Sequence, residues 1–136
     1  MLTDCLFCKF IHGDIPAEKI YEDEFTIVIL DIKPTNSGHA LVIPKRHAAD
    51  LLDGNNEDAQ RILMTVRKMS PTILSTVGAT ACNVITNIGP DAGQVIFHTH
   101  VHIVPRFPDD GFKHWPGKEV TKEELAELAE KIRSSI

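Results

Sequence analysis

The chain has 136 residues, of which 14 are basic and 19 acidic, so its formal net charge at pH 7 is -5. This length is typical of one domain that buries a core without disulfide bonds, and we expect a single domain over residues 1–136. The charge gives no basis for general binding to nucleic-acid backbones or anionic membranes, and no apolar run is long enough to span a bilayer.

The first half of the chain predicts a short helix followed by three strands. Asp4 is the expected N-cap of a helix that continues through Lys9 and ends at Gly13. An acidic turn separates the first two strands, and turn-forming residues precede the third, which is expected to stop at Pro44. The expected strands, rich in apolar, aromatic and β-branched residues, cover 19–21, 25–30 and 40–43.

The second half predicts two helices and two more strands. Apolar residues recur at helical spacing from about residue 56 to 77, and Ser70-Pro71 is expected to kink or split this helix. A final helix over 121–132 has Thr121 as its expected cap. The two strands, separated by a glycine-bearing turn, cover 81–88 and about 95–106. Together these elements predict an α+β fold, with a five-stranded antiparallel meander sheet and the helices on one side.

Three histidines alternate with other residues in the last expected strand: His98, His100 and His102. Residues two apart on a strand point to the same face, so we expect the three imidazoles in one row. The outer two would lie about 13 Å apart along a strand, too far to share one zinc ion, which binds nitrogen at about 2.0 to 2.1 Å. We expect one end of the row to serve a metal and the rest to act on a substrate, with a solvated strand face as the alternative.

Two of the three cysteines, Cys5 and Cys8, have the spacing of a thiolate zinc pair. A closed structural site needs two further ligands, for which His47 and His98 are the best candidates, and such a site would stabilise the fold. The alternative is two buried cysteines without metal, and Cys82 is interpreted as a core residue. Because three cysteines cannot all pair and the segment MLTDCLFCKF lacks the features of a secretory signal, we expect a reducing, cytoplasmic location.

The turn from Gly89 to Gly93 enters the histidine segment, and its glycines would let backbone amides approach a phosphate closely. An ordinary turn is the alternative. Asp31 could be a cap or a ligand to ribose hydroxyls. Phe7, Phe10 and Ile29 could belong to the core.

The segment His98-Thr99-His100-Val101-His102-Ile103-Val104 resembles the histidine triad (HIT) motif, in which three histidines alternate with apolar residues. The chain is similar to bacterial-type members of the branch that contains the histidine triad nucleotide-binding proteins. The resemblance covers nearly the whole chain. Its further matches are Asp14-Ile15-Pro16-Ala17, Tyr21-Glu22-Asp23, Leu30-Asp31-Ile32, Gly38-His39-Ala40-Leu41-Val42-Ile43-Pro44-Lys45 and Ala92-Gly93-Gln94.

The resemblance implies an enzyme, a nucleoside phosphoramidase or nucleotidyl hydrolase, that binds a purine nucleotide such as an AMP or GMP conjugate. It implies that His100 attacks the α-phosphate to form a nucleotidyl-histidine and that His102 contacts the phosphate. It implies a structural Zn²⁺ held by Cys5, Cys8, His47 and His98, and a homodimer in which two sheets join. The implied nucleotide-binding residues are Leu6, Phe7, Phe10, Ile29, Asp31, Asn87, Gly93, Gln94, Val95, His100 and His102.

Val95 stands where several relatives carry a serine or threonine that assists the leaving group. The segment His114-Trp115-Pro116-Gly117 resembles a C-terminal segment that in some relatives reaches toward the partner's active site. Two other functions remain open: a nucleotide-binding or partner-scaffolding module, favoured by Val95, and a metallohydrolase with a catalytic zinc at His100 and His102. The scissile group could be a phosphoramidate, an acyl phosphate or a dinucleoside polyphosphate.

Overall fold

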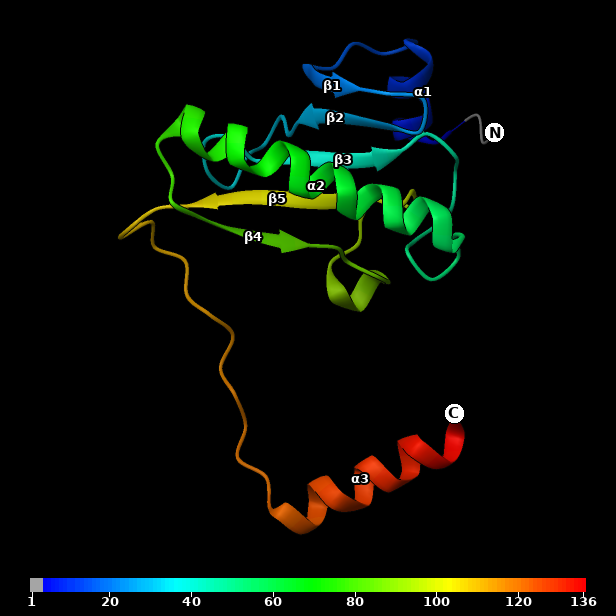
Figure 1. The fold of residues 1–136 in the computed structure, drawn as a ribbon, viewed down its shortest axis with the longest axis vertical. Coiled ribbons are helices and arrows are strands. Elements are labelled where there is room, and N and C mark those ends of the chain that lie inside the picture. The colour runs from blue at the N-terminus through cyan, green and yellow to red at the C-terminus, as the bar shows by residue number, and fades with distance from the viewer. Residues whose placement is uncertain (1–3) are drawn as a thin grey trace.

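The computed structural model describes residues 4–136 (Figure 1). Five strands form one antiparallel sheet in the order β1-β2-β3-β5-β4, which confirms the expected five-stranded α+β architecture. The first three strands follow one another as a meander, whereas the chain then passes through α2 to the edge strand β4 and returns as β5 between β3 and β4. In chain order the elements are α1 (Leu6–His12), β1 (Lys19–Glu22), β2 (Thr26–Leu30), β3 (Ala40–Pro44), α2 (Asn56–Val77), β4 (Ala81–Ile85), the 3-10 helix η1 (Pro90–Ala92), β5 (Val101–Arg106) and α3 (Lys122–Ser135).

The core has two parts, one on each face of the sheet. Val28 and Val42 pack with Ile62 of α2, whereas their strand neighbours, such as Ile27 and Ile43, pack with residues at the start of the chain. Residues next to each other on a strand point to opposite faces, so α1 covers the face opposite α2. The expectation that the helices lie on one side is therefore wrong for α1, because β2 and β3 are apolar on both faces and each face needs a cover.

The helix α1 ends at Gly13 as expected, but it begins at a different cap from the one expected. Its N-cap is Cys5, whose Sγ accepts a hydrogen bond from the Cys8 amide at 3.2 Å, so the expected cap at Asp4 is wrong. The C-cap is Gly13, whose φ of 79° lies in the left-handed region that glycine adopts readily.

The helix α2 continues through Pro71, so of the expected kink or split at Ser70-Pro71 the split is wrong. A proline inside a helix costs about 3 kcal/mol, and burial of Ile62, Val66 and Ile73 against the sheet offsets that cost.

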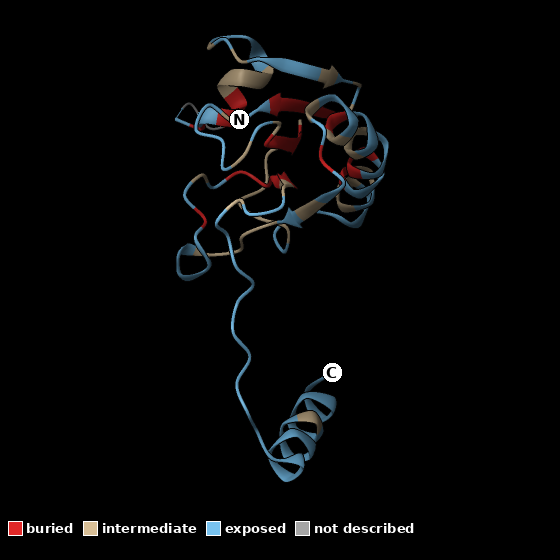
Figure 2. Cartoon of the chain, turned by 90° about the vertical axis from the view of Figure 1, so that its left-hand side faces the viewer, coloured by how far each residue is buried: buried red, intermediate tan, exposed pale blue. Residues whose placement is uncertain are grey.

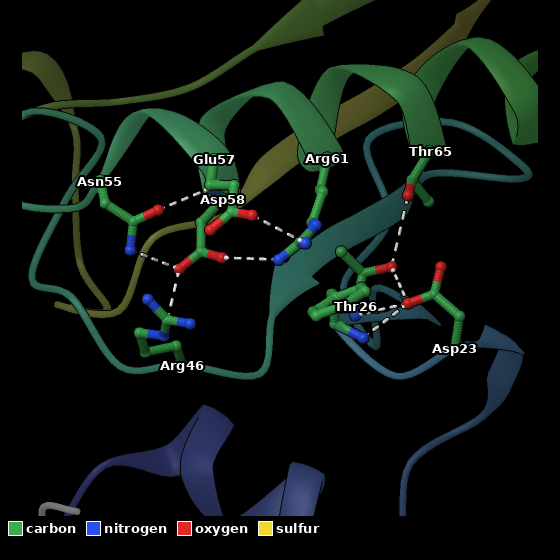
Figure 3. A network of polar contacts seen from close by, with 9 residues as sticks. Asp23, Thr26, Arg46, Asn55, Glu57, Asp58, Arg61 and Thr65 are labelled. Carbon is green, nitrogen blue, oxygen red and sulfur yellow. Dashed lines mark hydrogen bonds and ion pairs between the residues drawn. The ribbon is translucent and has the colours of Figure 1, made fainter.

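Polar contacts fix the start of α2 against the loops of the sheet (Figure 3). The Asn55 side chain accepts from the Asp58 amide at 2.8 Å, and the Asp58 carboxylate lies 3.6 Å from Arg46 in the loop after β3. On β2, the Thr26 hydroxyl lies 3.3 Å from that of Thr65 on α2. These contacts connect the start of α2 to the loop after β3 and to β2.

The last strand is much shorter than expected. β4 ends at Ile85 and β5 begins at Val101, so 86–100 form a loop that includes η1. Of the three histidines only His102 lies on a strand, and the expected row on one strand face is wrong for His98 and His100. The cause is local: the Thr99 amide donates to Ala48 O at 2.9 Å, in a loop and not in a strand ladder.

The C-terminal segment leaves the sheet as an extended stretch over 107–121 and ends in α3 (Figure 1). The expected capping box of Thr121 and Glu124 is confirmed. Figure 2 colours this segment almost entirely as exposed, and the apolar residues Leu125, Leu128 and Ile132 of α3 are 55 to 56% exposed. Among residues 4–136, no helix combines the length and apolar character that crossing a membrane requires.

Candidate functional site

Four residues from distant parts of the chain meet next to α1: Cys5, Cys8, His47 and His98. Their sulfur and nitrogen atoms all lie within 4.8 Å of one another. The Cys5 Sγ to His98 Nδ1 distance is 3.3 Å, both Cys8 Sγ to imidazole Nδ1 distances are 3.5 Å, and the two Nδ1 atoms are 3.1 Å apart. The structure therefore brings together the four ligands that were expected.

These distances fit a tetrahedral zinc site. Bond lengths of about 2.0 to 2.1 Å to nitrogen and 2.3 Å to sulfur place two nitrogens about 3.3 Å apart and a nitrogen and a sulfur about 3.5 Å apart. The observed separations agree with these values to a few tenths of an ångström. The residues present therefore fit zinc in both donor chemistry and spacing.

One backbone contact prepares His98 for this role. Its Nε2 lies 2.8 Å from Pro44 O, and because a carbonyl only accepts, Nε2 carries the hydrogen and Nδ1 keeps its lone pair. The side chain is fully buried, and this burial lowers its pKa to about 4, against the effect of the Pro44 hydrogen bond. Near neutral pH a neutral imidazole therefore points its lone pair at the two sulfur atoms.

A second backbone contact orients His100. Its Nδ1 donates to His98 O at 2.7 Å, which leaves the lone pair of Nε2 free. Burial lowers the pKa of His100, opposed by this hydrogen bond and by the charge of Asp31. The Phe7 ring packs edge to face against the imidazole, with 4.9 Å between the two ring centroids. The Thr86 hydroxyl donates to His100 O at 2.9 Å. A neutral, fixed imidazole of this kind is a competent nucleophile.

A third contact chain orients His102 through a residue that the sequence analysis did not single out, His39. The Thr35 amide donates to His39 Nδ1 at 3.0 Å, so the hydrogen of His39 is on Nε2, which donates to His102 Nδ1 at 2.9 Å. The remaining hydrogen of His102 is then on Nε2. Burial, with repulsion from the neighbouring histidines, lowers the pKa of His102 to about 4.

The same contacts decide whether Asp31, His39 and His102 form a second metal site, since their ligand atoms also lie within 4.8 Å of one another. A metal on His39 Nε2 would need the ring hydrogen on Nδ1, where the Thr35 amide already points its own hydrogen. This cluster therefore suits hydrogen bonding better than metal binding. The signal for His39 in the sequence was its position directly before the strand that pairs with the His102 strand.

A cleft of about 490 Å³ opens beside His100, within the range that small-molecule sites occupy. Its walls are mostly apolar, and Asp31 and Lys33 supply opposite charges. Ten of the eleven residues expected to bind a nucleotide line it: Leu6, Phe7, Phe10, Ile29, Asp31, Asn87, Gly93, Val95, His100 and His102. Lys33, Pro16 and Ala17 also line the cleft and were not predicted.

Gln94 is the exception among the expected nucleotide-binding residues. It does not line the cleft, and it is 4% exposed, with its side-chain amide bonded to backbone groups of the protein. Val95, by contrast, lies at the rim of the cleft and is 80% exposed.

Comparison with known proteins places this geometry in context. The family model described as HIT domain matches residues 12–109. The adenosine 5'-monophosphoramidase of Schizosaccharomyces pombe is 40% identical over 135 residues, covering 97% of this chain and 98% of that protein. A crystal structure from Streptococcus mutans has a TM-score of 0.94 at 38% identity, covering 99% of this chain and 87% of the other. A zinc-bound histidine triad family protein from Mycobacterium smegmatis has a TM-score of 0.77 at 35% identity, covering 94% and 97%.

Proposed function

The chain belongs to the HIT domain family, and from that membership we propose that it is a nucleotide hydrolase or transferase acting at the α-phosphate of a purine nucleotide conjugate. The observation that carries the proposal is His100, a buried imidazole whose free Nε2 faces a cleft with an apolar wall and an acidic residue. The relative from Schizosaccharomyces pombe, named an adenosine 5'-monophosphoramidase, supports a phosphoramidate as substrate.

The proposed reaction has two displacements at phosphorus. Nε2 of His100 attacks the α-phosphorus, a nitrogen–phosphorus bond to the enzyme forms, and the bond to the leaving group breaks with its electron pair. His102 donates its Nε2 hydrogen to a phosphate oxygen. Water then attacks the phosphorus and gives up a proton to the solvent, the bond to His100 breaks with its electron pair returning to Nε2, and the nucleoside monophosphate leaves.

The positive charge that His100 gains on nucleotidylation has a partner in the protein. Its Nδ1 hydrogen remains bonded to His98 O, and this bond strengthens as the ring becomes cationic. Asp31 adds a negative charge that favours the cationic ring. An amine leaving group needs a proton, and the apolar Val95 at the rim cannot supply one. The proton therefore comes from water, or the nitrogen of the substrate is already protonated when it binds.

We further propose that Cys5, Cys8, His47 and His98 hold a structural Zn²⁺. When bound, zinc would supply a closed tetrahedral cross-link between α1 and the histidine loop. The zinc-bound relative from Mycobacterium smegmatis supports this assignment. A reducing, cytoplasmic location follows as part of the proposal, because the two thiolates must stay reduced.

We also propose that residues 1–136 are a single HIT domain that works as a homodimer. The support is α3, whose apolar residues have no cover within residues 4–136. A helix of 14 residues is marginal in water without tertiary contacts. The similarity to the Streptococcus mutans structure spans 99% of the chain, so it includes this segment.

A nucleotide-binding or scaffolding module is the second candidate, favoured by Val95. A catalytic zinc at His100 and His102 is less well supported, because the hydrogen on His102 Nε2 occupies the position that a metal would need. The test is release of AMP from adenosine 5'-monophosphoramidate by wild type and His100→Ala, with adenosine affinity measured in parallel. Turnover by wild type alone that survives a metal chelator supports the enzyme, and turnover that a chelator abolishes in a still-folded protein points to the metallohydrolase. Binding without turnover in either protein points to the module, and equal turnover by the variant contradicts the role of His100.

A further inference from the structure

Gln94 lies in the loop that carries the phosphate-binding residues, yet it is buried outside the cleft. We propose that Gln94 is a positioning residue, whose side-chain amide braces the loop 89–96 against the segment after β3 and does not contact the nucleotide. This inference rests on the proposed function, because the nucleotide cleft is what the brace would serve.

The side-chain amide of Gln94 makes three hydrogen bonds, which occupy both of its hydrogens. Oε1 accepts from the Gly89 amide at 2.9 Å, and Nε2 donates to Ala49 O at 2.7 Å and to Ile96 O at 3.1 Å. Both hydrogens of the amide are therefore occupied, and none is left for a phosphate oxygen.

The partners also fix which way the amide points. The Gly89 amide can only donate, and the carbonyls of Ala49 and Ile96 can only accept. Turning the amide by 180° would set donor against donor and acceptor against acceptor at three places. The inward orientation is therefore the one that the surrounding backbone demands.

The loop needs such a brace because it has little regular structure. Between β4 and β5 the backbone has no strand partner, and Gly89 and Gly93 have φ values of 88° and 92°. The backbone N–H of Gln94 donates to Gly89 O at 3.1 Å, which closes the loop on itself. The side chain then ties this closed loop to Ala49.

The segment that receives the brace is itself part of the site. Ala48 and Ala49 directly follow His47, and Ala48 O accepts from the Thr99 amide at 2.9 Å. Two neighbouring carbonyls thus hold the phosphate loop at one end and the residue before His100 at the other. The brace therefore sets the distance between the loop that faces the phosphate and the nucleophile.

A loss of the brace should change the rate more than the binding of the nucleoside. Misplacement of a reacting group by about 1 Å can lower the rate by about 100-fold. For Gln94→Met, which keeps the length and removes the hydrogen bonds, we expect kcat for adenosine 5'-monophosphoramidate to fall by about 10- to 100-fold. Adenosine should bind within twofold of wild type, since the cleft residues expected to hold the base and ribose, Phe7, Phe10, Ile29 and Asp31, lie outside the loop 89–96.

The matched control is Gln60→Met, the same substitution at the only other glutamine of the chain, which is exposed on α2. It should leave kcat unchanged. The same variant assigns the side-chain signals, because protein labelled with ¹⁵N in the glutamine side chain gives two amide pairs and Gln60→Met removes one of them.

The direct test is the ¹⁵N–¹H signal pair of the Gln94 side chain in the full chain, with and without AMP. The proposal expects hydrogens that exchange slowly in the free protein and shift little when AMP binds. Fast exchange in the free protein and a large shift with AMP would mean that Gln94 contacts the phosphate, which overturns the proposal. A folded Gln94→Met protein with full kcat would also overturn it.

These outcomes are separable from those of the proposed function. If wild type binds AMP but does not turn over the phosphoramidate, the enzyme proposal fails while the signal pair still reports on the brace. If Gln94→Met does not fold, the measurement on wild type decides alone.

Discussion

The hydrogen-bond chain from Thr35 through His39 to His102 gives the sharpest test of how this site works. His39 accepts from a backbone amide with Nδ1 and donates to His102 with Nε2, at 3.0 and 2.9 Å. Two substitutions separate these contacts. His39→Gln places an amide nitrogen near the position of Nε2 and keeps the donor, whereas His39→Asn is too short to reach His102.

The size of the effect follows from the bond that is lost. A hydrogen bond of this kind contributes about 0.5 to 1.5 kcal/mol, and about 1.4 kcal/mol corresponds to a tenfold change in rate. Without its donor, His102 can place its hydrogen on Nδ1 and turn a lone pair toward the phosphate, which adds to the loss. We expect kcat/KM to fall about 10- to 100-fold for His39→Asn and less than fivefold for His39→Gln.

The assay is steady-state release of AMP from adenosine 5'-monophosphoramidate, with zinc content and thermal unfolding as controls for each variant. Equal losses in the two variants, with both folded, would refute the reasoning, because the orientation of His102 would then not depend on the donor.

Three further expectations concern metal, pH and assembly. Cys8→Ser should abolish stoichiometric zinc in metal analysis and lower the midpoint of thermal unfolding, whereas Cys82→Ser should retain the zinc. A wild-type protein that is equally stable with and without zinc would contradict this expectation. The pKa of His102 is about 4 in the folded protein, below its unfolded value of 6.5. The contribution of neutral His102 to the free energy of unfolding is therefore complete above pH 6.5 and is lost as pH falls toward 4, by at most about 1.4 kcal/mol per pH unit. In denaturant titrations, the free energy of unfolding should fall less per pH unit for His102→Gln than for wild type. An identical dependence on pH would contradict the effect of burial on the pKa of His102. Leu128→Asp should weaken the dimer in sedimentation while Glu127→Asp leaves it intact, and a monomeric wild type would reject the homodimer.

Most helices and strands could be predicted from the sequence because their local signals are strong. The strands over 26–30 and 40–44, the long helix and the capping box of the last helix all have local causes that survive in the fold. The cover on both faces of the sheet was not foreseen, although both faces of these strands are apolar. Such runs indicate burial on two sides, which the expectation of helices on one side overlooked.

The site was predicted by residue type more reliably than by geometry. The four zinc-type ligands and ten cleft residues came from spacing and resemblance, and the structure brings them together. The alternation of histidines suggested a strand, but the hydrogen bond from Thr99 to Ala48 holds this part of the chain in a loop, and β5 begins only at Val101, after His100. Contacts such as Gln94 to Ala49 join residues 45 positions apart. Local sequence patterns carry no information on them.

The central claim is that Nε2 of His100 forms a covalent bond to the nucleotide phosphorus. The most direct measurement is the intact mass of wild type and His100→Ala, acid-quenched within milliseconds of mixing with adenosine 5'-monophosphoramidate. We expect an added adenylyl group on wild type alone, located on His100 by peptide mapping. An adduct on the variant, or turnover by wild type with no adduct at any time, would contradict the claim.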